Sequence, residues 1–293
     1  MIDWNAIAAN IGRTSGQGFD PGVPRAVGGG CINKAYCLGS DTRRYFLKLN
    51  GADRLGMFEA EAAGLAEIAD TATIRVPRPL CTGTTVGSSY IVMEYVAFGG
   101  HRSGGAAEAG RQLAAMHRVS WQAFGWNRDN TIGSTPQPNN PEHSWVEFWN
   151  RQRLGFQLDL AVRNGYQRQL QDQGERLLGA LPSLIDHDPI PSLLHGDLWG
   201  GNMGFDSGGH PVVFDPAVYY GDREADVAMT ELFGGFGADF YAAYNDAWEL
   251  DPGYGTRKVL YNLYHILNHL NLFGTGYLAQ AQGMMERLLA QVR

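Results

Sequence analysis

The densest cluster of polar side chains among apolar ones lies at residues 195–202, with the pattern H-x-D-x-x-x-x-N. Its carboxylate, Asp197, could orient an attacking hydroxyl, and the amide oxygen of Asn202 could hold a metal ion without adding charge. Asp215 follows Asn202 by thirteen residues and ends a short apolar run. Each motif alone is typical of an ordinary turn. Together, in this order and spacing, they predict phosphoryl transfer, with Asp197 as the catalytic base and Asn202 and Asp215 as Mg²⁺ ligands.

A nucleotide needs a cation at its phosphates, and Lys48 lies within an otherwise apolar strand pattern, residues 45–49. A buried lysine is unfavourable unless it is paired. Two acids on the following helical segment, Glu59 and Glu61, are candidate partners, but they point about 200° apart on a helix. Glu61 shares the apolar side of that segment, so we favour it over Glu59 as the partner that completes a phosphate clamp.

The three glycines before Lys48, Gly28, Gly29 and Gly30, are followed by Cys31. Glycines allow backbone N–H groups to approach an anion closely, so this segment could fold over the phosphates. A simple hairpin turn is the alternative. The position of the glycines ahead of Lys48 favours nucleotide binding.

The apolar run at residues 91–96 leads into a joint at Phe98, Gly99 and Gly100. Such a joint could present backbone N–H and C=O groups to the edge of an adenine. We expect the main chains of Glu94 and Val96 to make these contacts.

The order of the surrounding elements indicates two parts. Residues 23–50 alternate in the manner of a β-hairpin, residues 57–69 have helical apolar spacing, and strands are expected at 80–83 and 90–96. Helices are expected at 106–117, 145–163, 169–181, 225–248, 257–272 and 279–292, with a β-rich segment at 193–215 and an irregular stretch at 125–144. We therefore predict an α+β protein with a small antiparallel N-terminal lobe, residues 1–98, and a larger helical lobe, residues 99–293.

The composition limits the classes of function. The chain has 293 residues, of which 44% are hydrophobic and 18% are charged, so it is not intrinsically disordered. The net charge of −7 arises after residue 98, where 14 basic and 21 acidic residues are found. This acidity disfavours a nucleic-acid surface. No apolar run is long enough to span a membrane, the first ten residues lack a basic region, and three cysteines suit a reducing compartment, so we expect a cytoplasmic protein without membrane contact.

The order of these motifs resembles the protein-kinase-like superfamily in its aminoglycoside and choline kinase branch. More narrowly, it resembles the fructosamine-3-kinase, or ketosamine-3-kinase, family. The narrower resemblance rests on GGGCI (28–32), FLKLN (46–50), MFEAEAAGL (57–65), VPRPL (76–80), LLHGDLWGGN (193–202), FDPAVYYGDRE (214–224), LFGGF (232–236) and LYNLYHILNHLNLFG (260–274). These motifs extend over nearly the whole chain.

This resemblance implies a bilobal kinase fold and an ATP- and Mg²⁺-dependent kinase that phosphorylates the 3-hydroxyl of ketosamines, which are sugar-amine adducts. The phosphorylated product releases its amine, so the family is associated with protein deglycation. The acceptor would be a small-molecule or protein-bound ketosamine, and the enzyme a monomer or weak homodimer. A kinase of another hydroxylated amine, such as an aminoglycoside or an amino alcohol, is one alternative. A catalytically silent nucleotide-binding module is another, disfavoured because Lys48, Asp197, Asn202 and Asp215 are all present.

Some residues have a structural and a functional interpretation. Trp199, directly after the catalytic turn, could stack on the acceptor or belong to the core. Along residues 260–272, Tyr261, His265 and either Asn268 or His269 share one helical stripe that could contact the acceptor or form a buried hydrogen-bond network. Asp226 matches a superfamily aspartate that braces the catalytic loop, but it could equally be a helix-start acid.

Overall fold

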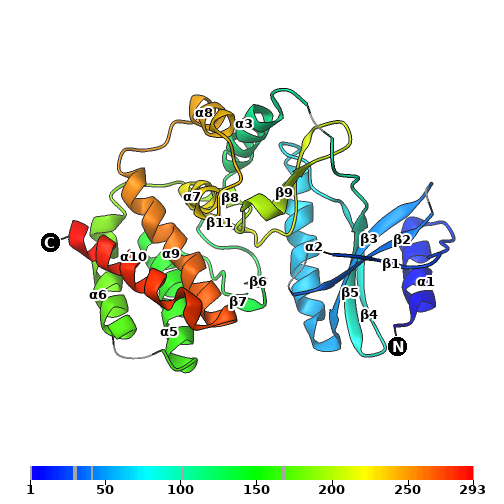
Figure 1. Ribbon diagram of the computed structural model, residues 1–293, viewed down its shortest axis with the longest axis horizontal. Helices are drawn as coiled ribbons and strands as arrows, with labels where there is room; N and C mark the ends of the chain where they lie inside the picture. Colours follow the sequence, from blue (N-terminus) through cyan, green and yellow to red (C-terminus); the bar gives the residue numbers. More distant parts are fainter. Residues whose placement is uncertain (1, 29–31, 41, 101, 167–168, 293) are drawn as a thin grey trace. The chain divides into compact units, whose positions relative to one another are not determined.

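The computed structural model describes residues 2–28, 32–40, 42–100, 102–166 and 169–292. They form two compact units (Figure 1). Unit 1 comprises Met1–Gly105 and Met203–Pro216, and unit 2 comprises Ala106–Asn202 and Ala217–Arg293. Unit 1 therefore extends beyond residue 98 and includes a hairpin that we expected in the second lobe.

Unit 1 is built on a five-stranded antiparallel sheet with the strand order β1-β2-β3-β5-β4. Its strands are β1 (Arg25–Val27), β2 (Lys34–Gly39), β3 (Arg44–Gly51), β4 (Pro79–Thr85) and β5 (Ser88–Glu94). Helix α2 (Leu55–Asp70) follows the short 3₁₀ turn η1 (Ala52–Arg54). The sheet and α2 confirm the expected N-terminal architecture.

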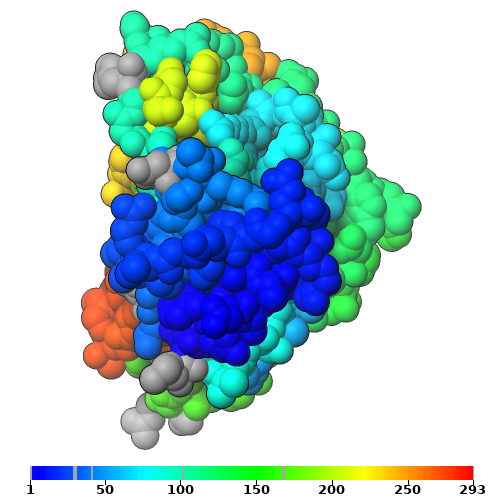
Figure 2. Space-filling view, turned by 90° about the vertical axis from the view of Figure 1, so that its right-hand side faces the viewer, coloured from blue at the N-terminus to red at the C-terminus, as the bar shows by residue number. Residues whose placement is uncertain are grey.

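A second helix of unit 1, α1 (Trp4–Ser15), was not among the expected elements. The Asp3 side chain accepts a hydrogen bond from the Ala6 N–H and caps its first turn, and Gly16 ends it in the left-handed region at φ 71°. Ile7 and Ile11 of α1 pack against Leu47 and Leu49 of β3. The N-terminal residues, dark blue in Figure 2, thereby cover one face of the sheet.

The two faces of β3 bury different kinds of side chain. Successive residues of a strand point to opposite faces, so Leu47 and Leu49 face α1 while Lys48 faces the other way. Helix α2 lies on that other face (Figure 1), with Phe58 and Leu65 fully buried. This alternation brings a lysine and a helical acid together beneath the sheet.

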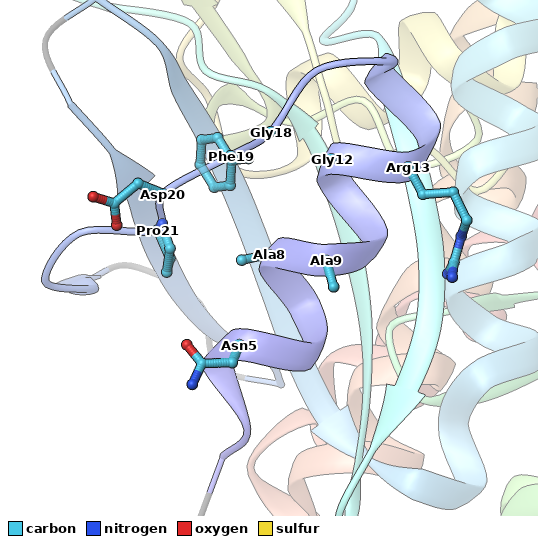
Figure 3. A pocket seen from close by; sticks show the side chains of 9 residues that line it. All are labelled: Asn5, Ala8, Ala9, Gly12, Arg13, Gly18, Phe19, Asp20 and Pro21. Atoms are coloured by element: carbon cyan, nitrogen blue, oxygen red, sulfur yellow. The ribbon is translucent and has the colours of Figure 1, made fainter.

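A surface hollow of about 630 Å³ lies beside α1. Figure 3 shows that the outer side of α1, including Asn5 and Arg13, forms one wall, and that Phe19, Asp20 and Pro21 form the other. All of its lining residues belong to α1 or to the segment that follows it, so Lys48 does not line this hollow.

The hairpin of β9 (Met203–Phe205) and β10 (Pro211–Val213) is tied to unit 1 by backbone and side-chain contacts. The Val213 N–H donates to the Arg75 carbonyl at 3.0 Å, and the Gly99 N–H donates to the Phe205 carbonyl at 3.1 Å. Arg75 also forms an ion pair with Asp206 in the hairpin turn. These contacts place Asp215, two residues beyond β10, in the same compact unit as Lys48.

Unit 2 is mostly helical. Its helical elements are α3 (Gly105–His117), which begins at the last residue of unit 1, α4 (Trp145–Phe148), the π-helical η2 (Trp149–Leu154), α5 (Gly155–Arg163), α6 (Gln169–Leu184), η3 (Gly200–Asn202), α7 (Glu224–Leu232), α8 (Ala238–Ala247), α9 (Tyr254–Phe273), η4 (Thr275–Tyr277) and α10 (Leu278–Gln291). Two small antiparallel strand pairs complete it: β6 (Asn130–Ile132) with β7 (Thr135–Gln137), and β8 (Ser192–Leu194) with β11 (Tyr219–Gly221).

Two expectations for this unit were wrong. The single helix expected at 225–248 is divided into α7 and α8, because Gly234 and Gly235 adopt φ values of 73° and 111° that end a right-handed helix. The stretch at 125–144 is not wholly irregular, since it contains the β6–β7 hairpin.

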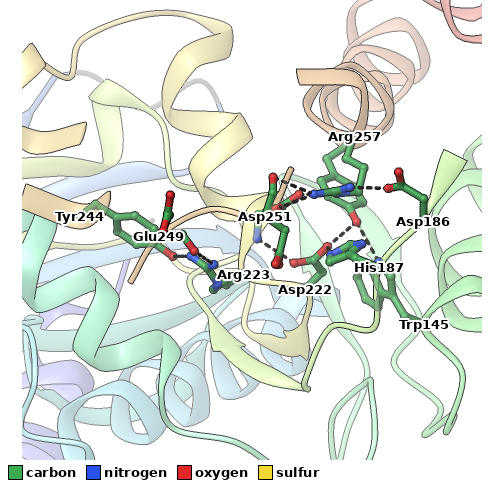
Figure 4. A network of polar contacts seen from close by, with 11 residues as sticks. Trp145, Asp186, His187, Asp222, Arg223, Tyr244, Glu249, Asp251 and Arg257 are labelled. Carbon is green, nitrogen blue, oxygen red and sulfur yellow. Dashed lines mark hydrogen bonds and ion pairs between the residues drawn. The ribbon is translucent and has the colours of Figure 1, made fainter. Parts of the chain in front are cut away.

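A buried polar network connects the start of α7 with α9 (Figure 4). Arg257, fully buried, donates from Nε and Nη2 to both carboxylate oxygens of Glu224, and from Nη1 to Asp186. Asp222 accepts a hydrogen bond from the Tyr261 hydroxyl at 2.5 Å and lies 2.8 Å from His187 Nε2. These pairs neutralise charges that would otherwise be costly to bury.

Over the residues that the structure describes, no helix combines the length and the apolar character needed to cross a membrane.

Candidate active site

The first group of functional side chains lies in unit 1 around Lys48. The ammonium group is 2.6 Å from Glu61 Oε1 and 2.5 Å from Asp215 Oδ1. The predicted pairing of Lys48 with Glu61 is confirmed. Lys48 of β3 thereby contacts Asp215, which lies two residues beyond β10 and 167 positions along the chain from Lys48.

The charges of this group perturb one another. Burial lowers the pKa of Lys48, but the nearby carboxylates of Asp215 and Glu61 outweigh burial and leave the pKa above its ordinary value. Burial raises the pKa of Glu61, and the Lys48 charge opposes that shift. The Lys48 and Glu61 side chains are 7% and 11% exposed, whereas that of Asp215 is 45% exposed. Asp215 is therefore the member of the group that solvent and a ligand can reach.

Asp215 has an uncommon backbone conformation. Its φ of 59° lies in the left-handed region, which is unfavourable for residues other than glycine and is less so for Asp and Asn. Pro216 follows directly. Such strain is often found at functional positions, where the surrounding structure enforces it.

The glycine segment is only partly described by the structure. Gly29, Gly30 and Cys31 lie outside the described residues, and no structural statement is made about them. Gly28, the first of the three glycines, follows β1. Asn33, shortly after the glycine segment, accepts a hydrogen bond from Asn50 Nδ2 at 2.7 Å. The phosphate-binding role of the segment stays a prediction.

The predicted adenine contacts lie at the end of β5. The Glu94 N–H donates to the Arg78 carbonyl at 2.8 Å, and the Glu94 side chain pairs with Arg75 at 2.6 Å. Val96 follows the strand and is buried. Since the Glu94 amide already has a partner in the fold, main-chain contacts to adenine would involve its carbonyl or the main chain of Val96, and they stay a prediction.

The second group lies in unit 2 and includes residues 195–202, which hold the predicted base Asp197 and which we call the catalytic loop. Asp226 braces this loop. One carboxylate oxygen accepts from the His195 N–H at 2.6 Å, and the other accepts from the Gly196 N–H at 2.8 Å. His117 Nε2 lies 3.2 Å from the same carboxylate. Burial raises the pKa of Asp226. The hydrogen bonds to its carboxylate and the neighbouring histidines lower the pKa by more, so the net shift is downward. The predicted bracing role is confirmed.

Sequence reasoning missed His117, which contacts Asp226 through Nε2 and the Tyr244 hydroxyl through Nδ1 at 2.8 Å. It lies at the end of α3, more than a hundred residues from Asp226. One histidine at the end of a helix carries no sequence signal for a partner so far along the chain.

Glycine is required at position 196 of the loop. Gly196 has φ 82°, and a Cβ atom there would lie 2.1 Å from the Ala217 carbonyl oxygen. The backbone pairs at this point, since the Ala217 N–H donates to the His195 carbonyl at 2.8 Å. A larger residue would separate these two backbone segments.

Asp197 and Asn202 lie together at the two ends of the loop. Asn202 Nδ2 donates to the Asp197 carbonyl at 2.8 Å and to Asp197 Oδ2 at 3.2 Å. With its NH₂ group directed at Asp197, the remaining polar atom of the Asn202 side chain is its amide oxygen, which is the atom a hard cation prefers. The donor set therefore suits Mg²⁺.

Four of the predicted acceptor contacts lie on α9, and they differ in exposure. Tyr261 is fully buried between Asp222 and Trp145 Nε1. His265 is buried, and burial lowers its pKa to about 3. Asn268 is buried against Gln157. His269, one turn of the helix beyond His265, is only partly buried. The first three are thus enclosed within the fold, and their contact with an acceptor stays a prediction.

A sequence model of the Fructosamine kinase family matches residues 3–291. The chain belongs to the fructosamine kinase family. It is 50% identical to a "Probable ketoamine kinase" of Synechocystis, across 98% of this chain and 97% of that protein. It is 44% identical to a chloroplastic protein-ribulosamine 3-kinase of Arabidopsis thaliana, across 92% of this chain and 83% of that protein. The family membership makes this chain a phosphotransferase that acts on a hydroxyl group.

Solved structures agree with the family and with the expected kinase-like fold. A Haemophilus somnus protein assigned as a fructosamine-3-kinase has a TM-score of 0.90 at 28% identity, with 98% of this chain and 97% of that chain covered. A more distant aminoglycoside phosphotransferase has a TM-score of 0.61 at 17% identity, with 97% and 98% covered, and shows the shared fold alone. The predicted bilobal kinase-like fold class is confirmed.

Proposed function

We propose that this fructosamine kinase family member uses ATP to phosphorylate the 3-hydroxyl of ketosamines. The observation that carries the proposal is the pairing of Lys48 with both Glu61 and Asp215. This pairing unites the strand lysine, the helix acid and the post-hairpin aspartate that phosphoryl transfer in kinase-like enzymes requires. The names of the relatives, ketoamine kinase and protein-ribulosamine 3-kinase, support the acceptor class.

In the proposed reaction, Lys48 holds phosphate oxygens of ATP. Its ammonium group is kept in place by Glu61, which is almost as buried as Lys48 itself. Asp215, being more exposed, is the partner that can turn from the lysine toward a ligand. The ion pairs thus prepare the cation for phosphate without leaving its charge unpaired in the free enzyme.

Asn202 and Asp215 would hold Mg²⁺, through an amide oxygen and a carboxylate that suit this ion. When bound, Mg²⁺ neutralises charge on the β- and γ-phosphates. Its use by this chain is part of the proposal.

Asp197 acts on the acceptor. Its carboxylate accepts the proton of the sugar 3-hydroxyl, the oxygen forms a bond to the γ-phosphorus, and the bond to the β-phosphate oxygen breaks to release ADP. Asp226 does not touch the acceptor, but it fixes the backbone of His195 and Gly196 next to Asp197. The loop is therefore preorganised for the proton transfer.

A ketosamine phosphorylated at O3 eliminates phosphate and releases its amine, so we propose that the enzyme repairs glycated amines in the cytoplasm. Free and protein-bound adducts are both compatible with this role. The oligomeric state expected from the sequence, a monomer or weak homodimer, stays a prediction.

The decisive assay compares acceptors at fixed ATP and Mg²⁺. Ribulosamine, erythrulosamine and fructosamine adducts of one amine, an aminoglycoside and an amino alcohol are each incubated with the enzyme, ADP release is measured, and ³¹P NMR locates the phosphate. We expect ADP release with the ketosamines and a phosphate on O3. Preferred phosphorylation of the aminoglycoside or the amino alcohol would replace the proposed acceptor class. No ADP release with any acceptor would favour a silent nucleotide-binding module.

A further inference from the structure

Five aromatic side chains of unit 2 form a continuous strip that begins on the catalytic loop. Trp199 contacts Phe233 with ring centroids 6.3 Å apart, and Phe233 contacts His269 at 5.1 Å. His269 then contacts Phe273 at 5.4 Å and Tyr277 at 5.1 Å. We call these five residues the aromatic strip. They come from the catalytic loop, the end of α7, the end of α9 and η4.

Three of the five rings in the aromatic strip are exposed to solvent, although large apolar side chains are usually buried. Trp199, Phe233 and Phe273 are 40%, 44% and 54% exposed. Among the described residues of unit 2, only one other large hydrophobic side chain is comparably exposed, Ile190. Three such rings gathered in one place form an apolar surface of the kind that marks a binding site.

Glycines in two loops hold the first rings of the strip in position. A Cβ atom at Gly201 would lie 2.2 Å from the Trp199 indole, so the ring rests directly on the backbone of the loop. A Cβ atom at Gly200 would lie 3.0 Å from the Gly234 carbonyl oxygen, and one at Gly235 would lie 3.0 Å from the Gly200 Cα. The catalytic loop and the segment after Phe233 therefore pack backbone to backbone.

The middle of the strip carries no positive charge at neutral pH. Burial lowers the pKa of His269, and the hydrogen bond to the His265 carbonyl only partly offsets this. Because a carbonyl only accepts, the His269 Nδ1 atom, 2.7 Å from it, carries the proton, and Nε2 keeps its lone pair. Neutral π faces attract ammonium groups, and they also pack against hydrocarbon stems.

We propose that the aromatic strip binds the amine-bearing part of a ketosamine acceptor, and that this part is a lysine side chain within a polypeptide. The proposal rests on the proposed function. The backbone N–H of Trp199 donates to the Asp197 carbonyl at 3.2 Å, so the strip starts two residues after the proposed catalytic base. Phe273 and Tyr277 are at the other end of the strip, joined to Phe233 through His269. We therefore assign the sugar to the Trp199 end and the rest of the acceptor to the Phe273 end. The secondary ammonium and lysine stem would follow the rings, and the flanking peptide would cover Phe273.

Substrates of different length test this assignment. Phe273→Ser and Tyr277→Ser are each assayed with two substrates. One is ribulosyl-methylamine, which lacks the hydrocarbon chain of lysine, and the other is a peptide that carries one ribulosyl-lysine. We expect kcat/KM for the peptide to fall about tenfold, mainly through KM, because aromatic anchors contribute strongly to binding. The value for ribulosyl-methylamine should change less than twofold. Ile190→Ser, which removes a side chain outside the strip that is about as exposed as Phe273, should affect neither substrate.

Equal losses on both substrates, or no loss on the peptide, would overturn the assignment. Thermal melting of each variant shows whether a loss comes from folding, and Phe273 is exposed enough for serine to be tolerated. If the unaltered enzyme phosphorylates neither ketosamine, the proposed function fails. If it phosphorylates both and the variants do not discriminate between them, the proposed function stands and only the role of the aromatic strip fails.

Discussion

The two units position their functional charges by different means. In unit 1, Lys48 is held by side-chain carboxylates, Glu61 and Asp215, and one of these is accessible to solvent. In unit 2, Asp226 is fully buried and accepts from two backbone N–H groups of the catalytic loop, with His117 as its one side-chain partner in the described residues. Side-chain partners can be exchanged for phosphate oxygens, whereas backbone partners fix a geometry. We therefore expect the side chains proposed to bind the nucleotide to exchange partners when it binds. We expect the loop proposed to act on the acceptor to be held in its reactive geometry beforehand.

Removal of the Asp215 carboxylate should cause the largest loss in unit 1. Asp215→Ala deletes a proposed metal ligand and one partner of Lys48, so we expect turnover to fall by about 10² or more at saturating ATP. Steady-state kinetics measure this change. Asp53→Ala, which removes a carboxylate that is 78% exposed, is the matched control and should behave as the unaltered enzyme does. Turnover within a fewfold of normal would remove Asp215 from the mechanism.

Substitution of Lys48 should act mainly on ATP. Lys48→Met keeps the length of the side chain but removes its charge, so kcat/KM for ATP is expected to fall by roughly ten- to a hundredfold. Lys34→Met, at an exposed position of β2, serves as the control. Because Glu61 is left buried without its partner, Lys48→Met should also lower the melting temperature, and adding Glu61→Gln should recover part of that loss. A double variant less stable than Lys48→Met alone would argue against the buried pair.

A smaller effect on activity is expected from Asp226→Asn in unit 2. Asparagine offers one accepting oxygen where Asp226 offers two, so the N–H of His195 or of Gly196 loses its partner. The free energy of unfolding should fall by about 1–3 kcal/mol, and kcat should fall by about tenfold with little change in KM for ATP. Asp239→Asn, at an exposed helix position, is the control. A change confined to KM for ATP would contradict the division of roles between the units.

The smallest expected effect concerns pH and the network of Figure 4. Burial lowers the pKa of His187, but the bond to Asp222 and its charge raise it by more, so the folded value lies above 6.5. A raised pKa in the folded state means that protonated His187 adds stability below its ordinary pKa, and that this stability is lost as pH rises through the raised value. His187→Gln should thus cost on the order of 1 kcal/mol at pH 5.5 and less at pH 9.

Denaturant unfolding at the two pH values measures this difference. His143→Gln, at an exposed position, is the matched control and should cost little stability at either pH. A larger loss at pH 9 than at pH 5.5 would show that the Asp222 contact does not stabilise the protonated ring.

The pairs that depend on local periodicity could be predicted from the sequence. Helical geometry separated Glu61 from Glu59, and strand alternation turned Lys48 away from Leu47 and Leu49. The contact between Lys48 and Asp215 could not be predicted in this way, because it depends on the β9–β10 hairpin being part of unit 1. No local periodicity indicates where the hairpin packs, because its position depends on long-range contacts such as the Arg75–Asp206 pair.

Other features were hidden or misjudged for physical reasons. The stripe of Tyr261, His265 and Asn268 has the spacing of a helix face, but spacing does not tell a polar face that meets a ligand from one that meets buried partners. The break between α7 and α8 did have a signal, the adjacent Gly234 and Gly235, which the apolar spacing on either side outweighed. Helix α1 has a capping residue and apolar spacing, and these signals were overlooked.

The central claim is that Asp197 in unit 2 performs the proton transfer while unit 1 binds the nucleotide. Asp197→Asn separates these roles, because it keeps the shape of the side chain but not its basicity. Calorimetry with ATP and Mg²⁺, followed by a single-turnover reaction with a ribulosamine, tests the claim most directly. We predict an ATP dissociation constant within about twofold of normal and phosphoryl transfer slowed by about 10² or more. Transfer at the normal rate by Asp197→Asn would contradict the account.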